Sequence, residues 1–282
     1  MDFFTPIHKN PYIFGQITAA NAVSDIFAVG GTILNCLNIL AFPNIIESDI
    51  ISKILQGAMD KVNEAGGVIV GGHSMTLDHI IYGLSVNGMV KKENLKTNSG
   101  AKPNQKIILT KKIGTGIYSN IINEFDDRAD CIEVINSMTT LNKIASELTH
   151  NYSVTALTDV TGFGLLGHLS EVMKASKVSA NIYVHKVPLF EKTRELCIHH
   201  ANGGMKRNAQ YFLKDISFSK AVKTEENLNI LFDPQTSGGL LIFVDEKDSQ
   251  ALLKELHQKG ITQAQIIGET LSKQAPLINV NE

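Results

Sequence analysis

Three aspartates are candidates for facing a ligand, and two of them, Asp25 and Asp159, lie next to small or glycine-rich segments. Asp159 follows the apolar run 154–157 and belongs to the predicted turn 158–162, so its side chain can project into a cleft. Asp25 lies among small residues in a predicted helix, and Asp2 begins a strand at the start of the chain. Such carboxylates suit Mg²⁺, which prefers oxygen ligands and can bridge a polyphosphate to an acidic site.

Each aspartate also has a plain structural interpretation. Asp159 is at a position typical of the N-cap of the helix that follows. Asp25 is consistent with a solvated surface residue, although an interior carboxylate among small residues would need a partner. Asp2 is consistent with an ordinary polar residue near a terminus. The residues alone leave these alternatives open.

A glycine-rich segment offers neutral hydrogen-bond donors. Gly72, His73 and Ser74 belong to a predicted turn, residues 71–74, that follows the buried strand 68–70. Backbone N–H groups and a hydroxyl in a turn can hold phosphate oxygens, and a plain tight turn is equally consistent. For His73, as for His168, a satisfied lone histidine is favoured over a metal ligand, because no second ligand follows at helical spacing.

Two common phosphate-binding motifs are excluded. Residues 162–167 read GFGLLG, which matches the dinucleotide fingerprint, but the next predicted strand, 181–184, ends at His185 without the acid that would hold a ribose. No GxxxxGK[ST] sequence is present. We therefore expect nucleotide phosphates to be held through metal ions on aspartates. The turn 233–239, DPQTSGG, is interpreted as structural.

Alternating apolar segments must position these groups. Strands are predicted near residue 4 and at 34–42, 68–70, 80–90, 106–110, 154–157, 181–184 and 240–244, with a closing strand near 265–267, and helices at 14–29, 48–63, 165–175 and 249–259. The polar segment 91–105 contains Gly100 and Pro103 and is the predicted linker. The class is therefore α/β or α+β with layered sheets, divided into domains at 1–95 and 96–282.

Composition excludes several classes of protein. No apolar run approaches the about 20 residues that a membrane span needs, and the start lacks the features of a secretory signal, so we expect a cytoplasmic protein. The net charge is −2 with scattered Lys and Arg, which argues against nucleic-acid binding. Three separated cysteines argue against disulfides and zinc.

Five segments together resemble a known family, the selenophosphate synthetases, also called selenide, water dikinases. They are DFFTPI (2–7), AANAVSDIFAVGG (19–31), GGHS (71–74), LTDVTGFGLLGHL (157–169) and DPQTSGGLL (233–241). The similarity runs from the first residue nearly to the last. The last two segments set this family apart from aminoimidazole ribonucleotide synthetase and thiamine-monophosphate kinase, which belong to the same wider group.

The resemblance implies an α+β, two-domain fold like that of aminoimidazole ribonucleotide synthetase, with an N-terminal sheet that forms a homodimer and a C-terminal α+β sandwich. It implies a phosphotransferase with paired acceptors that converts selenide, ATP and water into selenophosphate, AMP and phosphate. It also implies Mg²⁺ ligands at Asp25 and Asp159. The ATP-site residues that it implies are Asp2, Asp25, Gly72, His73 and Ser74.

The family's catalytic segment carries a Cys or selenocysteine, a Lys and a further Mg²⁺-binding Asp, and we expect it upstream of Met1. Cys36, Cys131 and Cys197 do not lie in such a motif. We therefore expect the chain as given to bind nucleotide weakly and not to turn over selenide. Two alternatives stay open: another ATP-using enzyme of the same fold, and a truncated paralogue that acts as a dimerising binding subunit.

Overall fold

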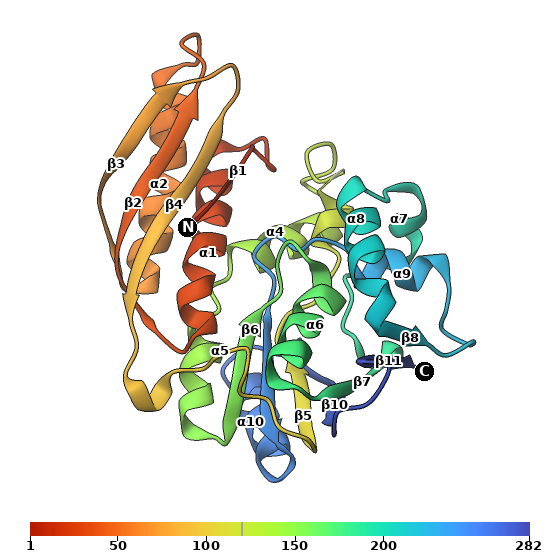
Figure 1. Ribbon diagram of the computed structural model, residues 1–282. Coiled ribbons are helices and arrows are strands. Elements are labelled where there is room, and N and C mark those ends of the chain that lie inside the picture. The colour runs from red at the N-terminus through yellow and green to blue at the C-terminus, as the bar shows by residue number, and fades with distance from the viewer. Residues whose placement is uncertain (120) are drawn as a thin grey trace.

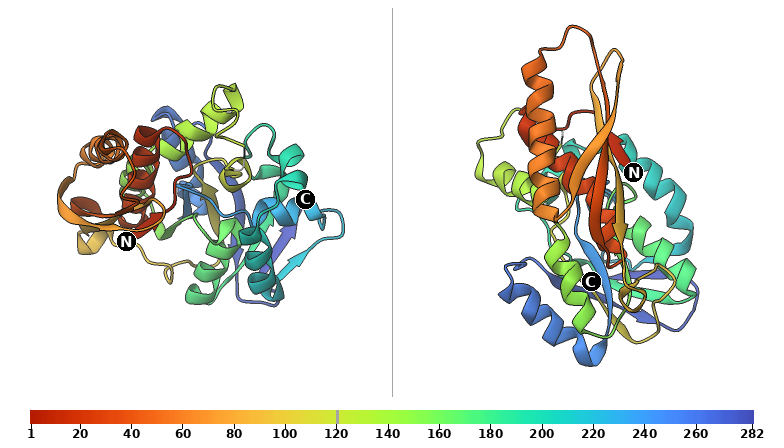
Figure 2. Two further views of the ribbon diagram at one scale, coloured as in Figure 1. Left: turned by 90° about the horizontal axis from the view of Figure 1, so that it is seen from above. Right: turned by 90° about the vertical axis from the view of Figure 1, so that its left-hand side faces the viewer.

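The N-terminal domain is a four-stranded sheet with two helices on one face (Figures 1 and 2). The computed structural model describes residues 1–119 and 121–282. The strand order is β1-β4-β2-β3, with β2 and β3 parallel and the other pairs antiparallel. The elements are β1 (Asp2–Phe4), α1 (Pro11–Ala28), β2 (Thr32–Phe42), α2 (Ser48–Ala65), β3 (Val68–Thr76) and β4 (Ile81–Met89).

Helices α1 and α2 begin and end where the sequence supplies the right chemistry. The side chain of Asn10 caps α1 by accepting hydrogen bonds from the N–H groups of Tyr12 and Ile13. Helix α2 ends at Gly66, whose φ of 91° is a left-handed conformation that glycine adopts readily. The apolar face of α2, which includes Ile54 and Val62, is buried against α1 and the sheet.

Two glycines let α1 and α2 pack with their backbones in close approach. A Cβ atom on Gly57 would lie 2.0 Å from the carbonyl oxygen of Tyr12 in α1, and one on Gly15 would lie 2.0 Å from the carbonyl oxygen of Ile54 in α2. No side chain fits at that distance without moving a helix. The separation of the two helices is therefore set by these glycines.

We expect Gly57→Ala to destabilise the protein, although alanine favours a helix by about 1 kcal/mol over glycine. Overpacking against a backbone atom costs about 1–3 kcal/mol or more, so the clash outweighs the propensity. Urea unfolding measures the difference. Gly203→Ala is the matched control, because a Cβ there meets only the flexible end of Arg207 at 3.3 Å. Equal or greater stability of Gly57→Ala would contradict the expectation.

The C-terminal domain is built on a seven-stranded sheet with the order β6-β9-β5-β10-β7-β11-β8. Its strands are β5 (Gln105–Leu109), β6 (Val154–Asp159), β7 (Ser179–Tyr183), β8 (Ile216–Phe218), β9 (Leu240–Asp245), β10 (Gln265–Leu271) and β11 (Ile278–Asn281). Pairing is antiparallel except on either side of β11, where β7 and β8 run parallel to it. This mostly antiparallel sheet supports the exclusion of a dinucleotide-binding fold, which needs a parallel one.

Helices surround this sheet (Figure 1). The α-helices are α3 (Thr115–Tyr118), α4 (Ala129–Thr139), α5 (Lys143–Leu148), α6 (Gly164–Ser176), α7 (Thr193–His199), α8 (Gly203–Phe212), α9 (Glu225–Leu231) and α10 (Glu246–Gln258). Short 3₁₀ turns are η1 (Lys92–Asn94), η2 (Thr149–Asn151), η3 (Val184–Lys186) and η4 (Leu213–Asp215). None of the helices in the described residues is long and apolar enough to cross a membrane.

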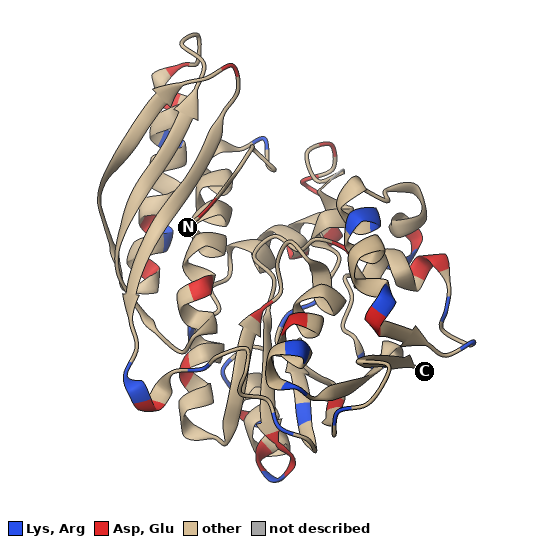
Figure 3. Cartoon of the chain, viewed as in Figure 1, with Lys and Arg blue, Asp and Glu red and all other residues tan. Residues whose placement is uncertain are grey.

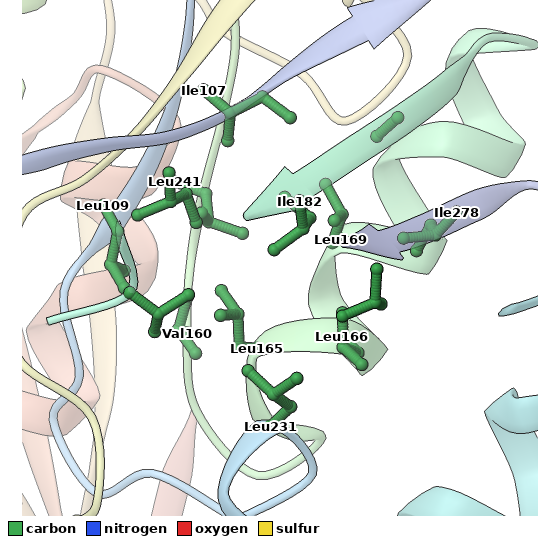
Figure 4. Packing of buried hydrophobic residues seen from close by; sticks show 14 of the residues in the cluster. Ile107, Leu109, Val160, Leu165, Leu166, Leu169, Ile182, Leu231, Leu241 and Ile278 are labelled. Atoms are coloured by element: carbon green, nitrogen blue, oxygen red, sulfur yellow. The ribbon is translucent and has the colours of Figure 1, made fainter. Parts of the chain in front are cut away.

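The main core lies between the seven-stranded sheet and helix α6. Leu165, Leu166 and Leu169 of α6 are fully buried and pack with residues of the sheet such as Ile182 and Leu241 (Figure 4). A second apolar cluster lies against α5 and α10. Burial on both faces fixes the positions of the strand ends, including the end of β6 at Asp159.

Three expectations from the sequence are wrong in detail. The predicted turn 71–74 continues strand β3, because Gly71 and Gly72 have φ values of 157° and 152°, a positive-φ extended conformation that glycine accepts without turning the chain. Asp159 is the last residue of β6 rather than a helix cap, since α6 begins only at Gly164. The strand near 265–267 is not the closing one, because β11 follows it.

Candidate active site

The three predicted carboxylates come together where α1 meets the C-terminal domain. Asp2 lies on β1, Asp25 on α1 and Asp159 at the end of β6. The charge of Asp159 acts on both Asp2 and Asp25, and the charge of Asp2 acts on Asp25. The structure therefore places carboxylates from both domains in one electrostatic environment.

This environment disfavours the charged forms of Asp2 and Asp25 by raising the pKa of each. Partial enclosure by protein raises the pKa of Asp25, and the charge of Asp159 raises it further, although Asp25 keeps access to solvent. Burial also raises the pKa of Asp2, while hydrogen bonds from the Phe3 N–H and from Asn21 oppose that rise. A cation between the carboxylates would relieve this mutual repulsion.

Asp159 has the feature expected of a metal ligand. It is 6% exposed, and its Oδ2 is buried without a hydrogen-bond partner among the described residues. Burying a carboxylate oxygen without a hydrogen-bond partner lowers the stability of the folded protein unless a ligand or ion binds that oxygen. By contrast, Asp25 is exposed, which corrects the interpretation of it as an interior carboxylate.

A cleft of about 440 Å³ lies beside this group of carboxylates. Asp2 and Asn21 line it from the N-terminal domain, and Gly162 and Gln235 line it from the C-terminal domain. Its remaining lining residues are Phe3, Phe4, Ile7, Thr161, Phe163, His168, Pro234 and Thr236. The cleft therefore joins the two domains at the predicted site.

Asn21 connects the cleft wall to the turn 233–239. Its Nδ2 donates to the carboxylate of Asp2, and its Oδ1 accepts from the N–H of Ser237 at 2.7 Å. Asn21 lies one turn before Asp25 on the same face of α1, and this spacing is what in the sequence indicates that Asn21 belongs to the site. This single side chain therefore orients Asp2 against the C-terminal domain.

The turn 233–239 holds the start of α3. The carboxylate of Asp233 accepts from the N–H groups of Gly116 and Ile117 at 3.0 and 3.3 Å, and Gln235 Oε1 accepts from the N–H groups of Gly114 and Thr115. Full burial raises the pKa of Asp233 to about 7, against the opposing effect of these hydrogen bonds. These contacts support the structural interpretation of the turn.

His168 lies on the cleft with its ring nitrogens engaged, as the sequence predicted. Its Nε2 accepts from the N–H of Phe163 at 3.3 Å and lies 3.3 Å from the hydroxyl of Thr161. Its Nδ1 lies 3.4 Å from a carboxylate oxygen of Glu171. These contacts of His168 with Thr161 and Phe163 hold the turn that follows Asp159 in position.

Gly72, His73 and Ser74 lie far from the carboxylates within one chain. Asp2, Leu84, Asn38 and Gly72 form one row across the sheet, in the order β1-β4-β2-β3. Three strand spacings of about 4.8 Å put Gly72 roughly 14 Å from Asp2. The structure thus does not bring the two parts of the predicted ATP site together in a single chain.

The three cysteines are free and buried. Burial raises the pKa of Cys36 and of Cys197 to about 11, and it also raises the pKa of Cys131. A thiol in such surroundings stays protonated and is a poor nucleophile. That none of the three is catalytic stays a prediction.

Comparison with known proteins follows the same division of the chain. Residues 1–90 match the N-terminal domain model described as AIR synthase related protein, and residues 102–279 match the corresponding C-terminal domain model. A selenide, water dikinase of Clostridioides difficile is 40% identical over 282 residues, which cover 99% of this chain and 81% of that protein. One of Caldanaerobacter subterraneus is 41% identical over 97% of this chain and 79% of that protein.

The chain belongs to the selenide, water dikinase family. Enzymes of this family are phosphotransferases with paired acceptors, as the sequence predicted.

Solved structures share the fold at low sequence identity. E. coli HypE matches with a TM-score of 0.75 and 13% identity over 99% of this chain and 80% of that one. Thiamine-monophosphate kinase of Stenotrophomonas maltophilia matches with a TM-score of 0.74 and 14% identity over 99% and 83%.

The donor set of this chain fits magnesium better than a metal with an all-protein shell. In the described part of the chain, no three His, Cys, Asp or Glu side chains are grouped so that they could hold a metal by themselves. Mg²⁺ is commonly held by one or two carboxylates, with waters and substrate phosphates as its other ligands. Asp25 and Asp159, with the orphaned Oδ2 of the latter, meet that requirement.

We expect Asp25→Asn to raise Tm by a few degrees in the absence of divalent metal. The pKa of Asp25 is raised in the folded protein, so the folded protein binds a proton at this carboxylate more tightly than the unfolded chain does, and the free energy of unfolding falls as pH rises through that pKa. At neutral pH the neutral side chain of the variant avoids this loss of stability. Thermal unfolding of both proteins in EDTA and in excess Mg²⁺ measures the difference in Tm, which should vanish with Mg²⁺. A lower Tm in EDTA would contradict the assignment.

Proposed function

We propose that this chain carries the nucleotide- and metal-binding body of a cytoplasmic enzyme that uses ATP to phosphorylate selenide, giving selenophosphate, AMP and phosphate. The observation that supports it most is the approach of Asp25 and Asp159 from two domains, with one oxygen of Asp159 buried and unpaired. Membership of the family supplies the reaction, and a HypE protein with the same fold has been solved in complex with ATP.

In this proposal Asp25 and Asp159 hold Mg²⁺, which neutralises the charge of the ATP phosphates when it is bound. Asp2 faces the same nucleotide from the cleft wall, with its carboxylate oriented by Asn21. The aromatic side chains of Phe3 and Phe163 line the cleft and are partly exposed to solvent.

The uncovered face of the N-terminal sheet supports a homodimer. Strands β2, β3 and β4 carry no Lys, Arg, Asp or Glu (Figure 3). Large apolar side chains are exposed on this sheet, and they are Phe3, Leu34, Leu37, Val68, Val70, Met75 and Met89. Many exposed apolar side chains on one uncharged sheet are typical of a protein interface.

Dimerisation would also explain how Gly72, His73 and Ser74 could belong to the ATP site although they lie far from Asp2 in one chain. Gly72, His73 and Ser74 are exposed at the β3 edge, opposite Asp2. Within one chain Gly72 lies roughly 14 Å from Asp2, too far for both to contact one phosphate group. We propose that a second copy brings its β3 edge to the nucleotide, so that the site is completed across the dimer.

The test is to follow nucleotide products with selenide as the acceptor. The protein is tested both as residues 1–282 and with an added N-terminal segment of the family that carries its Cys or selenocysteine and Lys. The proposal predicts AMP, phosphate and a selenophosphate signal in ³¹P NMR, and it predicts little turnover by residues 1–282 alone. ADP formation with thiamine monophosphate would instead indicate a kinase of the same fold, and nucleotide-independent dimerisation without turnover would indicate a binding subunit.

A further inference from the structure

Buried hydrogen bonds attach helix α1 to the C-terminal domain at every third residue. Asn21 accepts from the N–H of Ser237, the hydroxyl of Ser24 accepts from Asn142 at 3.0 Å, and the carbonyl of Phe27 accepts from a serine hydroxyl of α5 at 2.6 Å. These contacts follow one face of α1 for two turns, on either side of Asp25. The position of Asp25 relative to the C-terminal domain is therefore fixed by polar contacts.

Asn142 is the member of this series that bonds both to α1 and to the turn 233–239. Its side chain is 4% exposed, and Nδ2 donates to Ser24 Oγ at 3.0 Å and to the Gly238 carbonyl at 2.9 Å. Ser24 directly precedes Asp25 in α1. One amide group thus bonds simultaneously to α1 and to the turn 233–239.

The turn 233–239 is also bonded to the end of β6. The N–H of Val160, the residue after Asp159, donates to the carbonyl of Gly239 at 2.9 Å. A Cβ atom on Gly238 would lie 2.1 Å from the Val160 carbonyl oxygen, so the two backbones are in direct contact. Asn142 therefore bonds directly to Ser24, the residue before Asp25, and reaches Val160, the residue after Asp159, through Gly238.

A buried lysine keeps Asn142 in place. Lys111 Nζ donates to the carbonyls of Ser137, Thr140 and Ser237 at 2.9, 2.7 and 2.8 Å. Ser137 lies in the last turn of α4, Thr140 lies in the connection from α4 to Asn142, and Ser237 lies in the turn 233–239. All three donors of the ammonium are used, so this connection and the turn are held at a fixed separation.

We propose that Asn142 is a positioning residue that sets the separation of Asp25 and Asp159. The metal that it would serve rests on the proposed function, whereas the contacts themselves do not. Sites that hold ions require their ligands within about 0.5 Å of the productive geometry. Removing both donors of Asn142 leaves Ser24 Oγ and the Gly238 carbonyl without this partner, so α1 and the turn lose their shared restraint.

The test compares Asn142→Leu with Asn227→Leu. Asn227 is a similarly buried asparagine, 7% exposed, whose Nδ2 donates to the Val222 carbonyl at 2.8 Å in the same domain. Binding of Mn²⁺ with the ATP analogue AMPPNP is measured by electron paramagnetic resonance, and Tm is measured in parallel. We expect Asn142→Leu to weaken Mn²⁺ binding by about 10- to 100-fold, as for other residues that orient metal ligands. Asn227→Leu should lower Tm with affinity changed less than about 3-fold.

Ser24→Ala is the second variant, in case Asn142→Leu does not fold. It removes only the hydrogen bond between Asn142 and Ser24 Oγ, so we expect Mn²⁺ binding to weaken by only several-fold, with little change in Tm. Mn²⁺ affinity within about 2-fold of wild type in the folded variants, equal effects of the Asn142 and Asn227 changes, or no Mn²⁺ binding by the wild type would overturn the inference. Normal Mn²⁺ binding that depends on Asn142, without AMP formation from selenide, would instead refute only the proposed reaction.

Discussion

Asp159→Asn is expected to reduce Mg²⁺-dependent ATP binding by about 100-fold or more, a larger loss than the 10- to 100-fold typical of residues that only support a ligand. The substitution keeps the shape of the side chain but removes the charge that pairs with the cation. Asp159 Oδ2 has no donor among the described residues, so no protein contact to that oxygen is lost. Isothermal titration of ATP with and without Mg²⁺ measures the effect.

A matched control for Asp159→Asn is Asp248→Asn in the same domain. Asp248 is a carboxylate that accepts from the N–H of Ser153 at 3.0 Å, away from the cleft. Its replacement should lower stability slightly and leave ATP affinity unchanged. If both variants bind Mg²⁺ and ATP as tightly as the wild type, Asp159 is not a metal ligand.

Val70→Glu is expected to convert the proposed dimer into monomers. Val70 is 59% exposed on the uncharged sheet face, whereas its neighbour Ile69 packs toward the helices. Burying an unpaired carboxylate in an apolar interface costs several kcal/mol, and about 4 kcal/mol corresponds to a roughly 1,000-fold weaker association. Size-exclusion chromatography with light scattering, at matched concentrations, reports the mass.

Ile198→Glu provides the control, because Ile198 is 61% exposed on α7 outside this sheet. The control should keep the mass and the ATP affinity of the wild type. The Val70 variant should lose ATP affinity together with the dimer, since Gly72 to Ser74 would no longer reach a partner's nucleotide. A monomeric wild type, or a Val70→Glu dimer, would argue against this interface.

The sequence predicted the elements that carry Asp25 and Asp159 because both depend on local patterns. Helix α1 and strand β6 were expected within a few residues of their observed bounds, from small or apolar runs that end near glycines or turns. The strand character of 71–74 was missed, because consecutive glycines usually end a strand, whereas here their positive φ values keep the chain extended. The division at 95/96 stays a prediction, as do the roles of the site residues.

The contacts that fix the site could not be predicted in the same way. Asn142 and Ser24 are 118 residues apart, and Lys111 and Ser237 are 126 apart. Nothing in the local sequence of a single Asn or Lys indicates such a partner, because the first contact forms only when the two domains pack and the second only when distant segments of the C-terminal domain pack. The short helices α7, α8 and α9 were also not predicted, since their stability comes from tertiary packing more than from local pattern.

The most direct test of the proposed site is the position of a bound metal ion. Crystals grown with AMPPNP and Mn²⁺ in place of Mg²⁺ would locate the ion by its anomalous scattering. We predict at least one ion within about 2.0–2.3 Å of carboxylate oxygens of both Asp25 and Asp159, with phosphate oxygens completing its shell. An ion held by only one of these residues, or a nucleotide bound away from the cleft that Asp2 and Asn21 line, would contradict the convergence of the two domains on one site.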